Sequence, residues 1–186
     1  MNLSNKIIII SQQICGLLAV LILTGCSTEI VSSSQRIESE LVSKEYGETK
    51  EQYVNRSTSV SIEMMTNGSS ALIVTLNVYG RYLRSVKFYS REKDALIEAV
   101  DTFLEWEETA SSNGEILKKR ITRVKNPNDS AMYLSFHSES VGAHFLTIGY
   151  IDPGMIGETE FPFLVFNRKN AIRFKELLQM LPDYSS

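Results

Sequence analysis

The sequence predicts an α+β fold, with a mainly antiparallel sheet of six to seven strands and two helices in the order βββα-ββββα. Several segments alternate apolar and polar residues and are joined by short turns that contain Gly or Asn, which is typical of half-buried antiparallel strands. Two other segments, 91–108 and 168–181, repeat apolar residues every three to four positions, as amphipathic helices do. Short connections favour a layer of strands with both helices packed on one face.

The first 26 residues have the layout of a secretory signal. The amino terminus and Lys6 carry its positive charge, and an apolar segment, 14–23, follows. A transmembrane helix needs about 20 mostly apolar residues, and here an earlier apolar patch is separated by the polar residues 11–13. We therefore expect a cleaved signal peptide rather than a retained membrane span.

The apolar segment ends in Leu23-Thr24-Gly25-Cys26. This tetrapeptide resembles the lipobox of bacterial lipoprotein precursors, in which a small residue precedes the cleavage site and a cysteine follows it. The resemblance implies that the Cys26 thiol receives a diacylglycerol, that the signal is cut between Gly25 and Cys26, and that acyl chains hold the mature chain on the membrane. Ser27, where an inner-membrane lipoprotein would carry Asp, implies the periplasmic face of an outer membrane in a Gram-negative cell. The resemblance covers only this segment and implies no activity.

Composition limits the classes of partner. Removing residues 1–25 removes Lys6 and no acid, so the net charge moves from −3 to −4, and this mild acidity gives no indication of a nucleic-acid partner. Cys15 lies in the signal and Cys26 would be acylated, so the mature chain keeps no thiol for a disulfide. We expect packing alone to stabilise the fold.

Three regions follow from these patterns: a signal peptide at 1–25, an acylated cysteine with a flexible tether at 26–56, and one α+β domain at 57–186. The tether is predicted because the segment is rich in serine and in alternating Glu and Lys, and has too few apolar residues to bury much surface. Ile37 and Leu41 are at helical spacing, so a short docked helix is the alternative.

The first strand pair of the domain is predicted around Asn67-Gly68, which signals a hairpin turn. A two-residue loop would set apolar residues against polar ones. An odd-numbered loop such as 66–70 avoids this by setting Ile62 opposite Val74 and Met64 opposite Leu72.

The first helix is expected to follow a third strand at 82–89, with Ser90 as its N-cap. Glu105, Glu107 and Glu108 crowd the predicted end of this helix, which is unfavourable against the helix dipole. The remaining elements are expected as a basic strand at 116–124, strands at 131–138, 143–151 and 161–166, and a final helix at 168–181 capped by Asn167.

Two histidines, His137 and His144, suggest a metal site by their closeness in sequence. A three-residue turn with Gly142 in the left-handed conformation pairs Phe136 with Leu146 and places the two histidines on opposite faces of the hairpin. Side chains on opposite faces cannot bind one ion. We therefore expect neither a metal nor a cofactor.

Motifs for catalysis are absent from the sequence: it has no Gly-x-Ser-x-Gly elbow, no His-Glu-x-x-His helix and no Gly-rich phosphate loop. We expect a protein that is not an enzyme. Carboxylates that are distant in sequence can still converge as in glycosidases, so an envelope glycan hydrolase that uses Asp or Glu is an alternative hypothesis.

Basic and aromatic residues concentrate in two stretches that could form a binding surface for a partner protein or an anionic polymer. The candidates are Tyr79, Arg81, Tyr82, Arg84, Lys87, Lys118, Lys119 and Arg120. Charged residues also protect strand edges against aggregation, so a purely structural interpretation of both stretches is the alternative.

The leading hypothesis for function is a lipid-anchored, non-catalytic module that binds another envelope protein. A structural or phage-encoded surface lipoprotein is the further alternative.

Overall fold

The computed structural model describes residues 30–47, 52–78, 82–125, 131–151 and 161–183. The chain divides into two units, Met1–Ile30 and Val31–Ser186, and the fold below is that of the second unit. The tetrapeptide that ends in Cys26 lies outside the described residues. The predicted α+β class is confirmed, because two antiparallel sheets and two helices follow one another in the order βββββα-ββββα.

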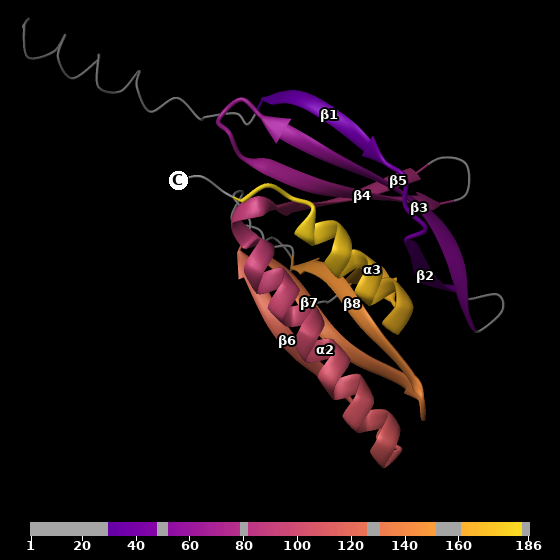
Figure 1. Cartoon of the computed structure of the whole chain (residues 1–186). Coiled ribbons are helices and arrows are strands. Elements are labelled where there is room, and N and C mark those ends of the chain that lie inside the picture. The colour runs from indigo at the N-terminus through magenta and orange to yellow at the C-terminus, as the bar shows by residue number, and fades with distance from the viewer. Residues whose placement is uncertain (1–29, 48–51, 79–81, 126–130, 152–160, 184–186) are drawn as a thin grey trace, which may run out of the picture. The chain divides into compact units, whose positions relative to one another are not determined.

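The first sheet has five strands (Figure 1). They are β1 (Val31–Ile37), β2 (Val42–Gly47), β3 (Gln52–Met65), β4 (Ser70–Val78) and β5 (Tyr82–Tyr89). The long strand β3 organises this sheet, because its first half pairs with β2, its second half pairs with β1 and its other edge pairs with β4. The strand β5 pairs with β4.

The tether predicted over residues 26–56 differs from the structure, which places β1, β2 and the start of β3 in that range. The folded unit begins at Val31. Six of the seven β1 side chains are exposed, so β1 is held by its backbone pairing with β3. Such a strand needs little apolar surface, and its composition therefore resembles that of a disordered linker. The alternative of a helix through Ile37 and Leu41 is also wrong.

The second sheet is a meander of β6 (Lys118–Lys125), β7 (Ala131–Ser140), β8 (Ala143–Ile151) and β9 (Phe161–Phe166). The predicted register of β7 and β8 is confirmed: Phe136 pairs with Leu146, and Gly142 has a φ of 76° in the turn. The first hairpin keeps its predicted faces with a shorter loop, since Ile62 pairs with Leu72 rather than with Val74. Its turn closes with the Met65 N–H donating to the Ser69 carbonyl at 2.8 Å.

The first long helix, α2 (Lys93–Asn113), follows a 3₁₀ turn at Ser90–Glu92. Ser90 is therefore not its N-cap, and its hydroxyl instead lies 3.3 Å from the Ser70 amide nitrogen. The helix ends at Gly114, whose φ of 67° suits the left-handed C-cap. The helix extends five residues beyond Glu108, so Glu105, Glu107 and Glu108 lie before its last turn. Arg168 also forms an ion pair with Glu107.

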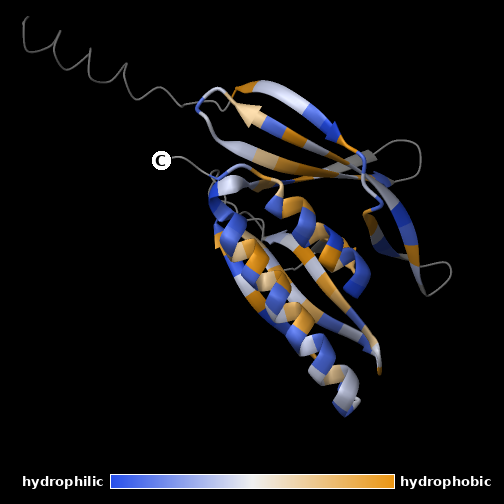
Figure 2. Cartoon of the chain, viewed as in Figure 1, coloured by the Kyte–Doolittle hydropathy of each residue, from blue (hydrophilic) through white to orange (hydrophobic). Residues whose placement is uncertain are grey.

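The second helix, α3 (Arg168–Gln179), begins as predicted, because the Asn167 side chain accepts a hydrogen bond from the Asn170 N–H at 3.1 Å. Both helices carry hydrophobic and hydrophilic residues along their length (Figure 2). α2 packs against β6, β7 and β8, whereas α3 packs against β8, β9 and α2.

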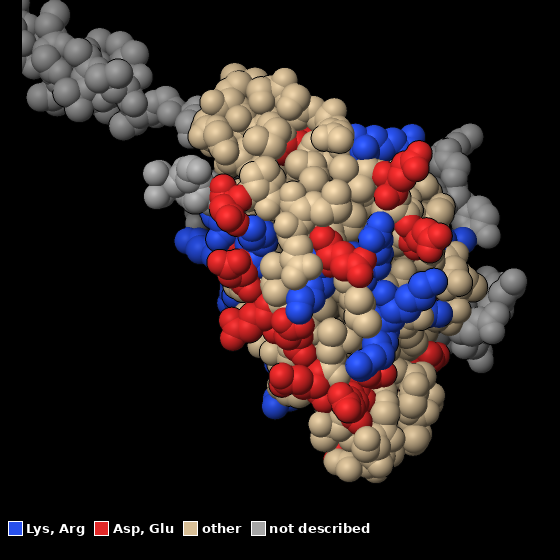
Figure 3. All heavy atoms as spheres, viewed as in Figure 1, with Lys and Arg blue, Asp and Glu red and all other residues tan. Residues whose placement is uncertain are grey.

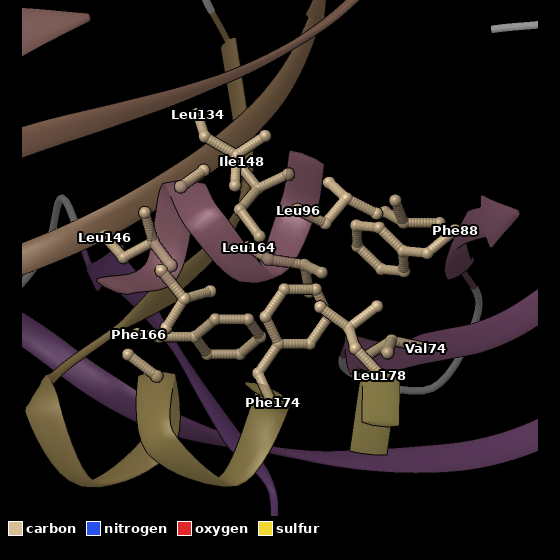
Figure 4. Close-up of a cluster of buried hydrophobic side chains, with 14 of the residues drawn as sticks. Val74, Phe88, Leu96, Leu134, Leu146, Ile148, Leu164, Phe166, Phe174 and Leu178 are labelled. Atoms are coloured by element: carbon tan, nitrogen blue, oxygen red, sulfur yellow. The ribbon is translucent and has the colours of Figure 1, made fainter. Parts of the chain in front are cut away.

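One hydrophobic core joins both sheets and both helices. Phe174 of α3 lies at its centre, with ring centroids 4.8 Å from Phe88 on β5 and 5.4 Å from Phe166 on β9 (Figure 4). The sequence predicts one layer of strands with both helices on one face, but α3 contributes to the packing of two separate sheets. Apolar spacing shows that a helix face is buried and does not show how many sheets bury it.

A second link joins the sheets through β2 and β9. Ser43 on β2 is fully buried, and its Oγ accepts a hydrogen bond from the Val165 N–H of β9 at 3.0 Å. Asn170 accepts a further hydrogen bond from the Val42 N–H at 2.9 Å.

Among the described residues, no helix is long and apolar enough to cross a bilayer.

Candidate functional site

The strand β6 carries the most concentrated charge of one sign. It has five cations and no acid in eight residues, and all five cationic side chains are exposed. It also forms one end of the four-stranded sheet. The cations are Lys118, Lys119, Arg120, Arg123 and Lys125.

A β-bulge decides which face of the sheet these cations occupy. Lys118 and Arg120 pair with His137 and Ser135, on the face opposite the hydrophobic core. The register shifts between Arg120 and Thr122, so one residue is inserted and Arg123 returns to the same face, opposite Tyr133. A regular strand would have placed Arg123 on the core side. Lys118, Arg120, Arg123 and Lys125 therefore form one row, which we call the basic row.

Lys119 lies on the other face. It pairs with Phe136 of the core, and its Nζ is 4.2 Å from the centroid of the Trp106 ring. This cation–π contact covers the indole at the margin of the core and is worth about 0.5–1 kcal/mol at an exposed site. Lys119 is therefore not part of the basic row.

The sheet beside the basic row is aromatic and polar. The Arg120 guanidinium lies 5.9 Å from the centroid of Tyr133, and Tyr133 and Ser135 are buried. The half-buried His137 faces Lys118 across the strands. Burial, and then the positive charge of Lys118, lower the pKa of His137 below 6.5, against a smaller opposite effect of Glu139. The positive charge of Lys118 therefore acts on His137, but burial is the larger cause of the lowered pKa.

The helical face has a different arrangement of charge, because cationic and acidic side chains are mixed there (Figure 3). Lys175 and Asp101 form an ion pair at 2.5 Å, and Arg173 and Glu176 form another at 2.7 Å. In the part of the chain that the structure describes, Lys118, Lys119 and Arg123 form no salt bridge.

The other predicted surface residues are placed elsewhere. Tyr79 and Arg81 lie outside the described residues, and Tyr82 and Arg84 are placed as positions in β5 without a described side chain. Lys87, also on β5, donates a hydrogen bond to Glu63 of β3 at 2.8 Å. The structure therefore assigns the two predicted stretches to different sheets.

The two histidines lie as the sequence predicts. His144 is buried on the core side, where its Nδ1 lies 2.8 Å from the Ser138 hydroxyl, and that hydroxyl also accepts a hydrogen bond from the Leu117 N–H at 3.2 Å. His137 is on the opposite face. The Ser138–His144 pair links the start of β6 to the β7–β8 hairpin. Among the described residues, no group of three or more His, Cys, Asp or Glu side chains could hold a metal ion.

A surface hollow of about 470 Å³ lies where β1 ends and β2 begins along β3. Arg36 and Glu38 are its charged lining residues, and its hydroxyls come from Ser39, Thr58 and Ser59. Two of these hydroxyls bind the backbone of Leu41. Glycosidic cleavage needs two carboxyl groups, and the described lining of this hollow supplies one. Sequence reasoning missed the hollow because it assigned residues 26–56 to a tether.

Comparison with known proteins finds no matching family model and no matching curated protein.

Proposed function

We propose that this chain is a lipid-anchored protein of the bacterial envelope whose folded unit binds an acidic segment of another envelope protein, without catalysing a reaction. The basic row on β6 is the observation that carries the binding part of this proposal. The row places four cations on one face of an exposed end strand, while the full chain has a net charge of −3. A local positive surface on an acidic protein favours an acidic partner in one orientation.

The tetrapeptide that ends in Cys26 supports the anchoring part. If Cys26 is acylated, residues 27–30 separate it from the first strand at Val31. This connection is much shorter than the tether of thirty residues that the sequence predicts. The folded unit would therefore stay close to the membrane that holds the lipid, and an acidic partner in the same envelope would meet it at a high local concentration.

The expected affinity is moderate. Arg120 and Lys125 already interact with other groups of the chain. An exposed ion pair contributes about 0.2–1 kcal/mol, so the two pairs that Lys118 and Arg123 can form add about 0.4–2 kcal/mol to binding. Salt screens such pairs, since the Debye length is about 8 Å at physiological ionic strength. We therefore expect binding that weakens as salt is raised and that depends on the row more than on any single cation.

The test of the binding part uses a fluorescent peptide of alternating Glu and Thr and the purified full chain. The variant combines Lys118→Gln with Arg123→Gln, and the control combines Lys169→Gln with Arg173→Gln on α3. Both lose two exposed or half-buried cations, so they change the net charge equally. We expect the β6 variant to bind the peptide at least threefold more weakly at low salt and the control to bind within twofold of the wild type. Equal weakening in both variants would contradict the proposed site.

The test of the anchoring part is Cys26→Ala in cells. The variant should accumulate as an unprocessed precursor or as a soluble chain, because the acylated thiol is lost. Maturation and membrane fractionation that match the wild type would overturn the anchor, and this result would leave the peptide-binding test unaffected.

A further inference from the structure

His137 lies beside the basic row. Its strand, β7, is the neighbour of β6 in the four-stranded sheet (Figure 1), and His137 pairs directly with Lys118 on the face opposite the hydrophobic core. Side chains directly opposite each other on neighbouring antiparallel strands have Cβ atoms about 4.5–5.5 Å apart. The His137 ring and the first cation of the basic row are therefore neighbours on one face of the sheet.

The His137 ring keeps its hydrogen-bonding capacity for a ligand. Its side chain is half-buried, and within the described part of the chain its ring forms no hydrogen bond or salt bridge. His144 differs in both respects, because it is buried in the core and its Nδ1 lies 2.8 Å from the Ser138 hydroxyl. A protonated imidazole donates from both of its nitrogens, so His137 can donate to a carboxylate at this surface.

Cations outnumber acids around His137. The charged and titratable side chains on the strands packed around it are Lys118 and Arg120 of β6, Glu139 of β7, Lys44 of β2 and Tyr53 of β3. Those of β2 and β3 approach through Phe145, which pairs with His137 on β8. The Phe145 ring centroid is 5.8 Å from the Lys44 Nζ and 5.0 Å from the centroid of Tyr53.

These surroundings disfavour the charged ring in the unbound chain. Burial, and then Lys118, lower the pKa of His137 below 6.5, and the opposite effect of Glu139 is smaller. The ring is therefore neutral at neutral pH and becomes charged on acidification.

We propose that His137 is a further member of the binding surface and, as an imidazolium, binds a carboxylate of the acidic partner, so that the surface binds this partner more tightly as the pH falls below neutral. This inference rests on the function proposed for the basic row and adds a regulation of that site by pH. A partner carboxylate beside Lys118 and His137 brings a negative charge next to the ring and therefore favours its protonated form. Because protonation and binding are linked, the protonated ring in turn strengthens the binding of the carboxylate.

The direction of the pH effect separates His137 from the acidic groups of the ligand. Glutamate has an ordinary pKa of about 4.3, so a peptide rich in glutamate stays mostly ionised at about pH 5.5, and any protonation of it would weaken binding. Protonation of His137 would strengthen binding. One additional exposed ion pair changes a binding constant by up to about fivefold.

The test measures binding of the fluorescent peptide of alternating Glu and Thr to the purified full chain at about pH 7.5 and about pH 5.5, at one low ionic strength. The wild type should bind about two- to fivefold more tightly at the lower pH. His137→Asn should match the wild type at the higher pH and bind equally at both. This variant keeps His144 and the amino terminus, so it controls for the other groups that titrate near neutral pH.

A second measurement needs no substitution. NMR titration of the wild type should show the pKa of His137 rising when the peptide is bound, because linkage is reciprocal. An unchanged or lower pKa in the bound state would overturn the inference, since the partner would then bury the ring without placing a charge beside it. Circular dichroism at both pH values checks that His137→Asn is folded.

Failure of this inference is distinguishable from failure of the proposed function. Wild-type binding that is equal at both pH values or weaker at the lower one, or a pH effect that persists in His137→Asn, would overturn the role of His137. The basic row would still stand if the combined Lys118→Gln and Arg123→Gln variant bound more weakly than the wild type. No binding of the peptide at either pH would overturn both.

Discussion

Replacement of Ser43 by alanine tests whether the segment before residue 57 belongs to the folded unit. Ser43 is fully buried, and its Oγ accepts the hydrogen bond from the Val165 N–H at 3.0 Å. Alanine removes this acceptor and leaves the amide of β9 buried without a partner. A buried donor that loses its partner costs about 1–3 kcal/mol, and for a unit of this size about 3 °C of melting temperature corresponds to each kcal/mol. We therefore expect the variant to melt about 3–9 °C below the wild type.

The assay is thermal unfolding and urea unfolding of the full chain, both followed by circular dichroism, with Ser33→Ala as the control. Ser33 is an exposed serine on β1, and its replacement should change the free energy of unfolding by less than about 0.5 kcal/mol. Hydrogen exchange adds a local readout, since the Val165 amide should be protected in the wild type and exchange faster in Ser43→Ala. A variant within about 0.5 kcal/mol of the wild type, with unchanged exchange at Val165, would refute the docking of β2 on β9.

Three further predictions concern the core, a helix cap and pH. Phe174→Ala should lower the free energy of unfolding by about 3–5 kcal/mol, because it empties the centre of the core, whereas Ile172→Ala on the exposed side of α3 should cost less than about 1 kcal/mol; urea unfolding measures both. Asn167→Ala should cost about 1 kcal/mol in the same assay, because it removes the N-cap of α3, and no loss would show that the cap is not needed. As the pH falls through 6.5, stability should decrease, because the pKa of His137 is lowered in the fold and the unfolded chain takes up the proton first. Unfolding at neutral and mildly acidic pH should show this slope in the wild type and less of it in His137→Asn, and NMR titration should show the pKa of His137 rising in Lys118→Gln; an unchanged titration would contradict the effect of Lys118.

The second half of the fold could be predicted well because residues close together in the sequence determine its strand pairing and its helix start. The pairing of Phe136 with Leu146 follows from alternation on both strands and from Gly142, which permits the tight turn. The start of α3 follows from the capping side chain of Asn167. These features depend on residues close together in sequence, so the sequence alone shows them.

The first half shows what local patterns do not contain. β1 is stabilised by backbone pairing with β3 and buries almost no side chain, so it leaves no hydrophobic period to detect. Ser43 has the composition of a linker residue, although it is buried between two sheets. The pairing of β1 and the burial of Ser43 both depend on strands that are distant in the sequence. The residues next to them in the sequence therefore do not indicate either feature.

The candidate site could be predicted in part. Clustering of Lys118 and Arg120 is visible in the sequence, but the bulge that turns Arg123 to the same face depends on the pairing of β6 with β7. The separation of Lys87 from this row likewise depends on which sheet holds each strand. Residue types thus indicated a basic surface, and the register determined which of its members lie on one face.

Photo-crosslinking from Arg123 in living cells tests the proposed binding at β6 most directly. A photoreactive amino acid replaces Arg123 in the full chain, and a matched chain carries it at Arg173 on the helical face. We predict that position 123 forms an adduct with another envelope protein through a peptide rich in Asp and Glu, that position 173 does not, and that Lys118→Gln weakens the adduct at 123. Equal adducts from both positions, or an adduct at 123 through a peptide without acidic residues, would contradict binding by the basic row.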